Sequence, residues 1–445
     1  MTKDMTTGSP LRIILLFSIP VLLGNLFQQF YNMVDTIIVG RYLGEEALAA
    51  VGSTGCLMFL VLGFANGIAQ GFGVMVSHAF GAKDFKLLRH YVALSLILTL
   101  IISLLLTIPT VTASRLLLAW MHTPENIIAM ADAYIKVIFA GILLTMAYNV
   151  LSGILRGIGD SRTPLYFLIL SSVLNIILDV VLIVYTGLGT AGAAYATIIA
   201  QGVSAVLCFF YRKYDILRTR HEDYYLDSAG VKNMLAIGVP MALNYSITAI
   251  GTMIMQSAVN VFGSSVVAAF TAASKVSNIA TQSMPTLGTA MATYCGQNLG
   301  AGKYDRIYAG MRQGLFLCFG AAATAAAICI FGGRFIVSWF VSNPSEEIFS
   351  SAMQYLTIAS WFFLPLAMIF LYRNALQGLD QGLIPMLSGV IELACRFGVI
   401  ALVPASTGFF GVCFADPAAW AGAGIPLFIT YLLWEHRMKQ CSMAV

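Results

Sequence analysis

Two acidic residues lie inside long apolar stretches of the chain, and they are the first whose type and position could support chemistry. Asp35 follows Pro20, and Asp179 follows Pro164, by the same interval of 15 residues. A carboxylate inside a membrane span is energetically costly, and where one occurs it usually marks an ion or proton pathway. Carboxylate oxygens are also ligands that hard cations prefer. We therefore expect Asp35 and Asp179 to bind H⁺ or Na⁺.

Two neutral side chains with oxygen atoms are expected at the depth of this pair. Asn175 precedes Asp179 by one helical turn and shares its helix face. Thr197 lies about 10 Å into the following predicted helix, which returns from the same side of the membrane. The sequence thus predicts a cation-coupling site at Asp35, Asn175, Asp179 and Thr197, whose oxygens are candidate ligands for Na⁺. Alternatively, Asp35 lines an outer vestibule and Asp179 caps a neighbouring helix.

Composition requires that transmembrane helices position these residues. The 445 residues are 59% hydrophobic and 10% charged, with a mean hydropathy of +0.85. Soluble domains carry about 25% charged residues, so the bilayer must be the solvent for this chain. The net charge of +4 is too small to indicate nucleic-acid binding, and the eight cysteines form no CxxC pair or metal cluster with histidine. No HExxH or GxSxG motif is present, so we expect no enzyme, no catalytic residue and no cofactor.

Apolar stretches of about 20 residues predict twelve spans. The 42 residues Asn233–Ser274 contain no Asp, Glu, Lys or Arg and would form a helix of about 63 Å, so they must turn back, most simply at 262–265. The same reasoning predicts a turn at 187–189. The predicted spans are 12–40, 47–77, 91–113, 127–152, 164–186, 190–211, 234–262, 266–298, 308–333, 348–372, 385–405 and 411–434.

The basic residues predict the orientation of these spans. With twelve spans, 18 Lys and Arg residues fall in one set of loops and only Arg41, Arg115 and Arg334 in the other. Because positive loops face the cytoplasm, both termini are expected there, in the inner membrane of a bacterium or an archaeon. The split also supports twelve as the number of spans, since a miscount by one would scramble it.

The chain repeats itself at an offset near 220 residues. Ile19-Pro20 matches Val239-Pro240, Gly81-Ala82 matches Gly300-Ala301, and Pro164 matches Pro385. This repeat predicts an all-α membrane protein with two six-helix lobes, related by a pseudo-twofold axis along the membrane normal. The predicted domains are an N-terminal lobe at 1–211, a cytoplasmic linker at 212–232 and a C-terminal lobe at 233–445.

Several of these motifs carry a resemblance to a known family. The block with Pro20, Gln28-Gln29, Asp35 and Val39-Gly40, together with the run from Leu155-Arg156-Gly157 to Pro164, resembles the multidrug and toxic compound extrusion (MATE) family. The resemblance covers the whole chain. It implies coupling to H⁺ or Na⁺ and export of amphipathic organic cations.

The residues of the candidate site also match one branch of that family. Asp35, Asn175, Asp179 and Thr197 are similar to the pattern of the DinF-like branch, in which bending of the first helix is proposed to follow protonation. This resemblance makes Pro20 a candidate hinge, because proline removes a helix hydrogen bond. A static kink is the alternative.

The C-terminal half departs from this acidic pattern. Gln256, within one residue of the repeat equivalent of Asp35, is neutral. The NorM-like branch of the family keeps acidic residues in spans seven and ten, and the corresponding spans here contain none. The resemblance therefore implies no second cation site in this half. Lys275, Glu392 and Arg396 lie in predicted spans instead. Glu392 and Arg396 either neutralise each other internally or join Gln256 and Lys275 in a substrate cavity that contacts an anionic or zwitterionic group.

The leading hypothesis is therefore a monomeric antiporter in the lipid bilayer, which exports small amphipathic compounds or drugs in exchange for H⁺ or Na⁺ by alternating access. The alternative is a flippase for lipid-linked or other anionic substrates, which Lys275 and Arg396 favour and the number of spans disfavours. A channel is disfavoured because no segment resembles a selectivity filter. Neither reading requires a nucleic acid or a protein partner.

Overall fold

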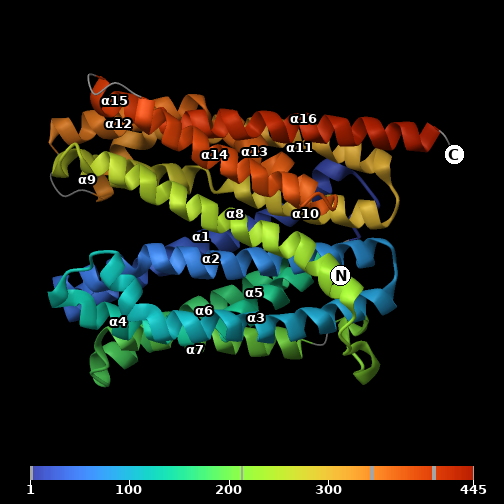
Figure 1. The fold of residues 1–445 in the computed structure, drawn as a ribbon, viewed down its shortest axis with the longest axis horizontal. Coiled ribbons are helices and arrows are strands. Elements are labelled where there is room, and N and C mark those ends of the chain that lie inside the picture. The colour runs from blue at the N-terminus through green and yellow to red at the C-terminus, as the bar shows by residue number, and fades with distance from the viewer. Residues whose placement is uncertain (1–3, 212–213, 341–344, 403–406, 444–445) are drawn as a thin grey trace. The chain divides into compact units, whose positions relative to one another are not determined.

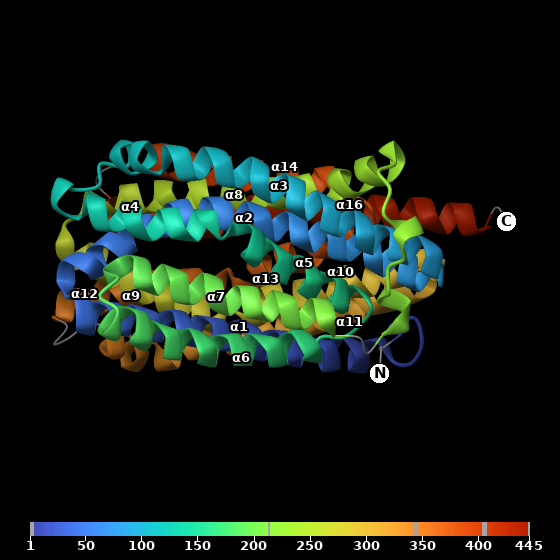
Figure 2. The ribbon, with the colours of Figure 1, turned by 90° about the horizontal axis from the view of Figure 1, so that it is seen from below.

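The computed structural model describes residues 4–211, 214–340, 345–402 and 407–443, and within these ranges the chain is helical with no strand (Figures 1 and 2). The predicted all-α membrane fold is confirmed. The first half contains α1 (Pro10–Leu43), α2 (Glu45–Gly81), α3 (Phe85–Trp120), α4 (Glu125–Ala140), α5 (Ile142–Gly157), α6 (Arg162–Val180), the π-helical turn η1 (Val181–Tyr185) and α7 (Gly189–Phe210). The second half contains α8 (Ser228–Asn260), α9 (Ser264–Ala280), α10 (Ser283–Gly300), α11 (Tyr304–Phe340), α12 (Glu346–Trp361), α13 (Phe363–Gly378), α14 (Leu383–Leu402), α15 (Gly408–Val412) and α16 (Ala415–Met443).

The described helices agree closely with the predicted spans. Nine are long and apolar enough to cross a membrane, and two bent pairs, α4 with α5 (47°) and α12 with α13 (53°), bring the number of such segments to eleven. Predicted span 266–298 corresponds to α9 and α10, which are shorter and richer in polar residues. The end of predicted span 385–405 lies outside the described residues. The predicted turns are present, with Gly263, Gly187 and Gly189 at positive φ.

The chain divides into two compact units, and two of the dividing points, after Ser18 and after Ser246, fall inside the helices α1 and α8. Unit 1 is built mainly from Ile19–Ser246, and unit 2 from Met5–Ser18 with Ile247–Val445. The beginning of α1 therefore belongs to unit 2, and the first part of α8 belongs to unit 1. The lobes predicted from the repeat instead placed the division in the linker 212–232, whose first two residues lie outside the described ranges.

Close helix packing explains why the first part of α8 joins unit 1. Gly67 and Gly71 lie one turn apart on α2, and a Cβ atom added to them would lie 2.4 Å from the Cα atoms of Ala242 and Gly238, respectively. Small residues at this spacing let two helix backbones touch, which is a common basis of helix association in membranes. The contact ties α8 to α2 before α8 continues into unit 2.

The chain that precedes α1 is bound in unit 2 by the end of α10 and the start of α11. The backbone N–H of Met5 donates to Gln297 Oε1 (2.9 Å), and Arg306 Nη2 donates to the Met5 carbonyl (3.0 Å). Lys303 Nζ donates to the Thr6 carbonyl (2.8 Å). The Met5 side chain is fully buried. We call residues 5–8 the N-terminal strap.

The linker before α8 is held in a similar way in unit 1. His90, near the start of α3, contacts the carbonyl of Asp223 (3.1 Å) and Oδ1 of Asp227 (2.7 Å), and Tyr225 stacks on its ring. The helices α1 and α8 contain the repeated prolines Pro20 and Pro240. Each is thus preceded by a segment that is hydrogen-bonded to a neighbouring helix.

Candidate functional site

A polar stripe runs along α1 in unit 1. Asn25, Gln28, Asn32 and Asp35 recur at intervals of three or four residues, which places them on one face of the helix. Such a face cannot be covered by lipid at low cost, because each amide and carboxyl group needs a hydrogen-bonding partner. The stripe therefore faces the protein interior.

Asp35 meets Asp179, which α6 supplies. The two carboxyl groups lie close enough to interact electrostatically with each other. Asp179 is fully buried, and neither of its oxygens, nor Oδ1 of Asp35, has a hydrogen-bond donor among the described residues. One residue after Asp179, α6 ends and η1 begins, a kind of helix irregularity that is frequent at functional sites. A buried carboxyl pair without other partners needs a proton or a cation to neutralise it.

Asn175 and Thr197 form the second contact of the site. Asn175 lies one turn before Asp179 on α6, and its Nδ2 donates to Thr197 Oγ1 on α7 at 3.4 Å. Asn175 is 2% exposed, and its Oδ1 has no donor among the described residues. The structure thus brings the four predicted coupling residues together as two contacting pairs joined through α6.

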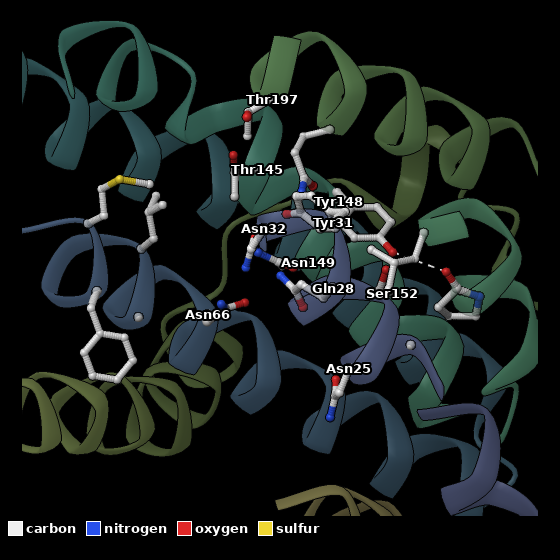
Figure 3. Close-up of a pocket in the computed structure, with 18 of the residues that line it drawn as sticks. Asn25, Gln28, Tyr31, Asn32, Asn66, Thr145, Tyr148, Asn149, Ser152 and Thr197 are labelled. Atoms are coloured by element: carbon white, nitrogen blue, oxygen red, sulfur yellow. Dashed lines mark hydrogen bonds between the residues drawn. The ribbon is translucent and has the colours of Figure 1, made fainter. Parts of the chain in front are cut away.

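A cavity of about 420 Å³ lies within unit 1 beside these pairs. Asp35 and Thr197 line it, whereas Asn175 and Asp179 lie behind its wall. Figure 3 shows Gln28, Tyr31 and Asn32 of α1 facing the same space as Tyr148, Asn149 and Ser152 of α5. The cavity is therefore lined by neutral amides, hydroxyls and tyrosine rings, with one carboxyl group of the coupling pair at its wall.

A second polar stripe on α5 forms much of this wall. The lining residues of α5 are Thr145, Tyr148, Asn149, Ser152 and Arg156, again at intervals of three or four residues. The Tyr148 hydroxyl donates to the carbonyl of Pro164 at 3.2 Å (Figure 3). Sequence reasoning missed the stripes of both α1 and α5 as cavity walls. The sequence signal for both stripes is a polar residue at every third or fourth position inside an otherwise apolar span.

Pro20, the predicted hinge, lines the cavity from α1 and is buried. It lies inside the helix two residues after Ser18, where the chain passes from unit 2 to unit 1. Proline leaves the carbonyl one turn earlier without its usual helix donor. The position of Pro20 suits a hinge, and its movement stays a prediction.

In unit 2, Glu392 and Arg396 belong to a larger buried network. Glu392 accepts from Arg373 Nη2 (2.9 Å) and from Arg396 Nη2 (3.5 Å), and Arg396 Nε donates to Asp416 Oδ1 (2.9 Å). Asp416 also accepts from the Tyr355 hydroxyl (2.8 Å). All five residues are buried, at most 9% exposed. Two guanidinium groups thus balance two carboxylates, which favours internal neutralisation over a substrate-facing wall.

Arg373 and Asp416 were not expected in this network. The prediction placed Arg373 in a cytoplasmic loop after a span that ended at 372, but α13 continues to Gly378 and buries it. Asp416 lies in the first turn of α16, where helix termini are hard to locate from hydropathy. The remaining predicted cavity residues lie apart from this network. Gln256 donates to Asn260 (2.9 Å), and Lys275 is exposed with no hydrogen bond or ion pair to another described residue.

The side chains of the candidate coupling site offer oxygen atoms as ligands for a cation. It offers two carboxyl groups, an amide and a hydroxyl, which suit H⁺ or a hard cation such as Na⁺. Within the described ranges no cluster of three or more His, Cys, Asp or Glu side chains could hold a metal ion. The arrangement can take up and release a cation, and it carries no nucleophile with a neighbouring base.

A multi-pass helical bundle with a polar cavity and a buried carboxyl pair defines a membrane transport protein rather than an enzyme. A family model described as MatE matches residues 20–181 and again 240–402. The chain therefore belongs to the MatE family of transporters, as the resemblance of its motifs predicted. The two matches begin at Pro20 and Pro240, which is the offset of the internal repeat.

Named relatives cover nearly the whole chain. It is 30% identical to the probable multidrug resistance protein YpnP of Bacillus subtilis over 413 residues, 92% of each protein. It is 25% identical to the FAD transporter of Shewanella oneidensis over 414 residues, 90% of this chain and 88% of that protein. A solved structure of a MOP superfamily transporter from Pyrococcus furiosus has the same fold, with a TM-score of 0.92 and 24% identity over 98% of each chain.

Proposed function

We propose that this transporter is an antiporter that exports small amphipathic organic compounds in exchange for H⁺ or Na⁺. The carrying observation is the contact between Asp35 and Asp179 at the wall of the cavity, with no donor for either Asp179 oxygen among the described residues. The curated relatives named as multidrug resistance proteins support the export of drugs.

The carboxyl pair supports coupling through its own electrostatics. Two carboxylates in contact repel each other strongly when both are ionised, and burial removes the water that would screen them. A proton shared by the pair, or a Na⁺ ion held with the help of Asn175 and Thr197, removes the repulsion. When the cation leaves, the pair must separate or gain access to water, so occupancy favours one arrangement of α1 relative to α6.

Alternating access follows if the cation and the substrate prefer different arrangements. A ligand shifts a conformational equilibrium only through its different affinities for the two states. Asp35 is suited to this task, because it contacts Asp179 and lines the cavity on the same helix as Pro20. In this mechanism cation uptake moves α1 and changes the cavity that holds the substrate.

The cavity has a suitable size for a drug-like substrate. Its volume of about 420 Å³ lies within the range of about 300–1,000 Å³ typical of small-molecule sites. The relatives are named for different cargoes, multidrug resistance in one case and FAD in another. The residues that line this particular cavity must therefore decide what this chain carries.

Transport by purified protein in liposomes tests the proposal. Efflux of a fluorescent dye is measured under an imposed pH gradient and, separately, under an imposed Na⁺ gradient. Asp35→Asn and Asp179→Asn should abolish gradient-driven transport while the protein remains monodisperse. Asp132→Asn is the matched control, because Asp132 pairs with Lys136 away from the cavity.

Two outcomes would contradict the proposal. Normal gradient-driven transport by both coupling variants would exclude these carboxyl groups as the coupling site. Transport by the unsubstituted protein that responds to neither gradient would exclude exchange for H⁺ or Na⁺. The gradient that drives transport identifies the cation.

A further inference from the structure

One arginine on the cavity wall has no partner. Arg156 lies in the last turn of α5 and lines the cavity, half-buried. Its guanidinium makes no hydrogen bond or ion pair with any residue that the structure describes. Tyr148, Tyr245 and Cys208 lie near enough to interact electrostatically with it, and none of them is a carboxyl group. Its positive charge is therefore not balanced by an acidic group beside it.

The other buried arginines of the chain show what such a group normally requires. Arg373 and Arg396 in unit 2 each donate to carboxylates at 2.9 Å. A guanidinium stays charged in a protein, and leaving it partly desolvated without a counter-charge is costly. Arg156 carries this cost beside an open cavity instead of against another side chain. A group that enters the cavity can supply the missing negative charge.

The position of Arg156 separates it from the coupling site. Ile198, which follows Thr197, packs on Gly141, and Thr145 comes one turn later at the start of α5. Arg156 lies 11 residues beyond Thr145 on the same helix face, which is about 16 Å along the axis. The cavity therefore has the carboxyl pair toward one end of the α5 stripe and the guanidinium at the other.

The wall that carries Arg156 is tightly packed. Cβ atoms added to Gly153 and Gly157 would lie 2.9 Å from the Ala69 carbonyl oxygen and 2.7 Å from that of Gly73, so α5 and α2 touch through their backbones on both sides of Arg156. A group held on such a wall is positioned before the ligand arrives, which reduces the entropy lost on binding. The rings of Tyr31 and Tyr148 line the same cavity as Arg156 and Asp35, and Figure 3 shows the two rings next to each other.

We propose that Arg156 binds an anionic oxygen group of the substrate, a carboxylate or a phosphate, and that the cargo is an aromatic anion or zwitterion. The planar guanidinium matches both groups with two parallel N–H···O bonds. The tyrosine rings accept the aromatic part, and the amides of α1 and α5 accept further polar groups. The inference rests on the proposed function, because it assigns the substrate class to the same cavity.

Equilibrium binding to the purified protein, without any gradient, tests this assignment. The probes are a xanthene dye with a free carboxyl group and the methyl ester of the same dye, which differ only in the anionic group. The unsubstituted protein should bind the acid at least about tenfold more tightly than the ester, or about 1.4 kcal/mol. Arg156→Gln should lose this preference, and Arg156→Lys should keep part of it. A benzyl phosphate competitor should displace the acid if phosphate is also accepted.

Controls separate recognition from folding. Arg162→Gln removes an exposed arginine only six residues away, outside the cavity lining, and should keep the preference for the acid. Thermal unfolding in detergent shows whether Arg156→Gln is folded. In transport, Arg156→Gln should raise KM for the acid while changing kcat little, and it should leave the KM for the ester nearly unchanged.

The results also separate this inference from the proposed coupling. Equal or tighter binding of the ester by the unsubstituted protein, or an unchanged preference in folded Arg156→Gln, would overturn the role of Arg156. Asp35→Asn and Asp179→Asn should lose gradient-driven transport yet keep the acid preference in binding. If no gradient drives transport but the acid preference depends on Arg156, the coupling proposal fails and the recognition site stands.

Discussion

The two units place charge inside the membrane protein in opposite ways. Unit 1 buries Asp179 near Asp35, with no donor for either Asp179 oxygen among the residues that the structure describes. Unit 2 surrounds Glu392 and Asp416 with arginines and a tyrosine. The positions are related, since Arg396 is the repeat equivalent of Asn175. A duplicated helix bundle has thus retained a reactive carboxyl pair in one copy and a closed, neutral network in the other. Among the described residues, the carboxyl pair of unit 1 thus has no counter-charge, whereas the buried charges of unit 2 neutralise one another.

The largest expected loss of stability comes from removing an arginine from the buried ion-pair network of unit 2. Arg396→Leu leaves Asp416 without its guanidinium and Glu392 with Arg373 alone. Breaking a buried ion pair by removing one partner typically costs about 3–5 kcal/mol. We expect a large fall in the thermal unfolding temperature in detergent. Arg334→Leu is the control, because its pair with Glu346 is exposed and should contribute less than about 1 kcal/mol. Equal losses in the two variants would contradict a structural role for the network.

The second largest loss of stability is expected where α2 packs against α8 in unit 1. Gly67→Ala places a Cβ atom 2.4 Å from the Cα of Ala242, so α8 must move away from α2. Such overpacking costs about 1–3 kcal/mol. Gly52→Ala on the same helix meets no atom within 4 Å and should leave the unfolding temperature unchanged or slightly higher. If both alanines behave alike, the backbone contact is not what joins α8 to unit 1.

A third prediction contrasts the coupling pair with a fully bonded carboxylate in unit 1. Asp160 lies between α5 and α6 and accepts from Thr163, Tyr214 and the backbone of Arg162. Burial alone raises the pKa of Asp160, but these hydrogen bonds outweigh it and lower the pKa. Stability from a lowered carboxyl pKa is present above the unfolded value of about 4 and is lost as pH falls through the folded pKa.

Asp160→Asn should therefore lower stability by about 1–2 kcal/mol at pH 7, and the difference should shrink at acidic pH. Unfolding temperatures measured from about pH 7 to pH 3 in the same detergent check both parts. A difference that stays constant or grows on acidification would show that ionised Asp160 does not stabilise the fold.

A smaller change in stability, of opposite sign, is expected when one member of the carboxyl pair is replaced. Asp179→Asn removes a buried group without a donor and supplies an amide N–H that can bond to Asp35 Oδ1. Stability should stay the same or increase by up to about 1 kcal/mol, although coupled transport is lost. Thermal unfolding of the unsubstituted protein and the variant under the same conditions gives the comparison. A loss as large as that of Arg396→Leu would mean that Asp179 is structural.

The smallest effect is expected at the edge of the site. Thr197→Val removes one hydroxyl, whose contact with Asn175 is long at 3.4 Å. We expect less than about 1 kcal/mol in stability. If Na⁺ is the coupling ion, the variant should need a higher Na⁺ concentration for half-maximal transport, whereas a proton-coupled protein should be nearly unaffected. Thr190→Val, which removes a hydroxyl bonded to the Met130 carbonyl outside the cavity lining, is the control.

The spans, the turns and the coupling residues could be predicted because each depends on local sequence or on spacing. An apolar length fixes a span, and Asp35 and Asp179 stand out because a carboxylate is rare there. Equal distances from Pro20 and Pro164 gave the two carboxyl groups a common depth. Hydropathy averages over many residues, however, so it ended span ten one residue before Arg373 and gave no sign of Asp416 in the first turn of α16.

Partnership between helices could not be predicted in the same way. The contact of Arg396 with Asp416, and the lack of a described partner for Arg156, depend on which helices are neighbours in space. The division of α8 between units involves backbone contacts of Gly67 and Gly71, which hydropathy does not reveal. The repeat therefore predicted two lobes but placed their boundary in the polar linker.

The N-terminal strap has a consequence for how the protein is made. Met5 is bound by Gln297, 292 residues later in the chain, so its binding site does not exist until the ribosome has passed α10. Residues 5–18, which include the start of the first helix to leave the ribosome, must therefore wait for unit 2. In turn, unit 1 is complete only when the first part of α8 has been synthesised.

The two halves are therefore obligate partners during biogenesis. A gene split in the linker would give a first fragment that carries a piece of unit 2 and a second fragment that carries a piece of unit 1. To complete both units, each fragment would have to supply its piece to the other, so neither unit can be completed by one half of the chain alone. A chain truncated before α10 would lack the hydrogen bonds that hold the N-terminal strap.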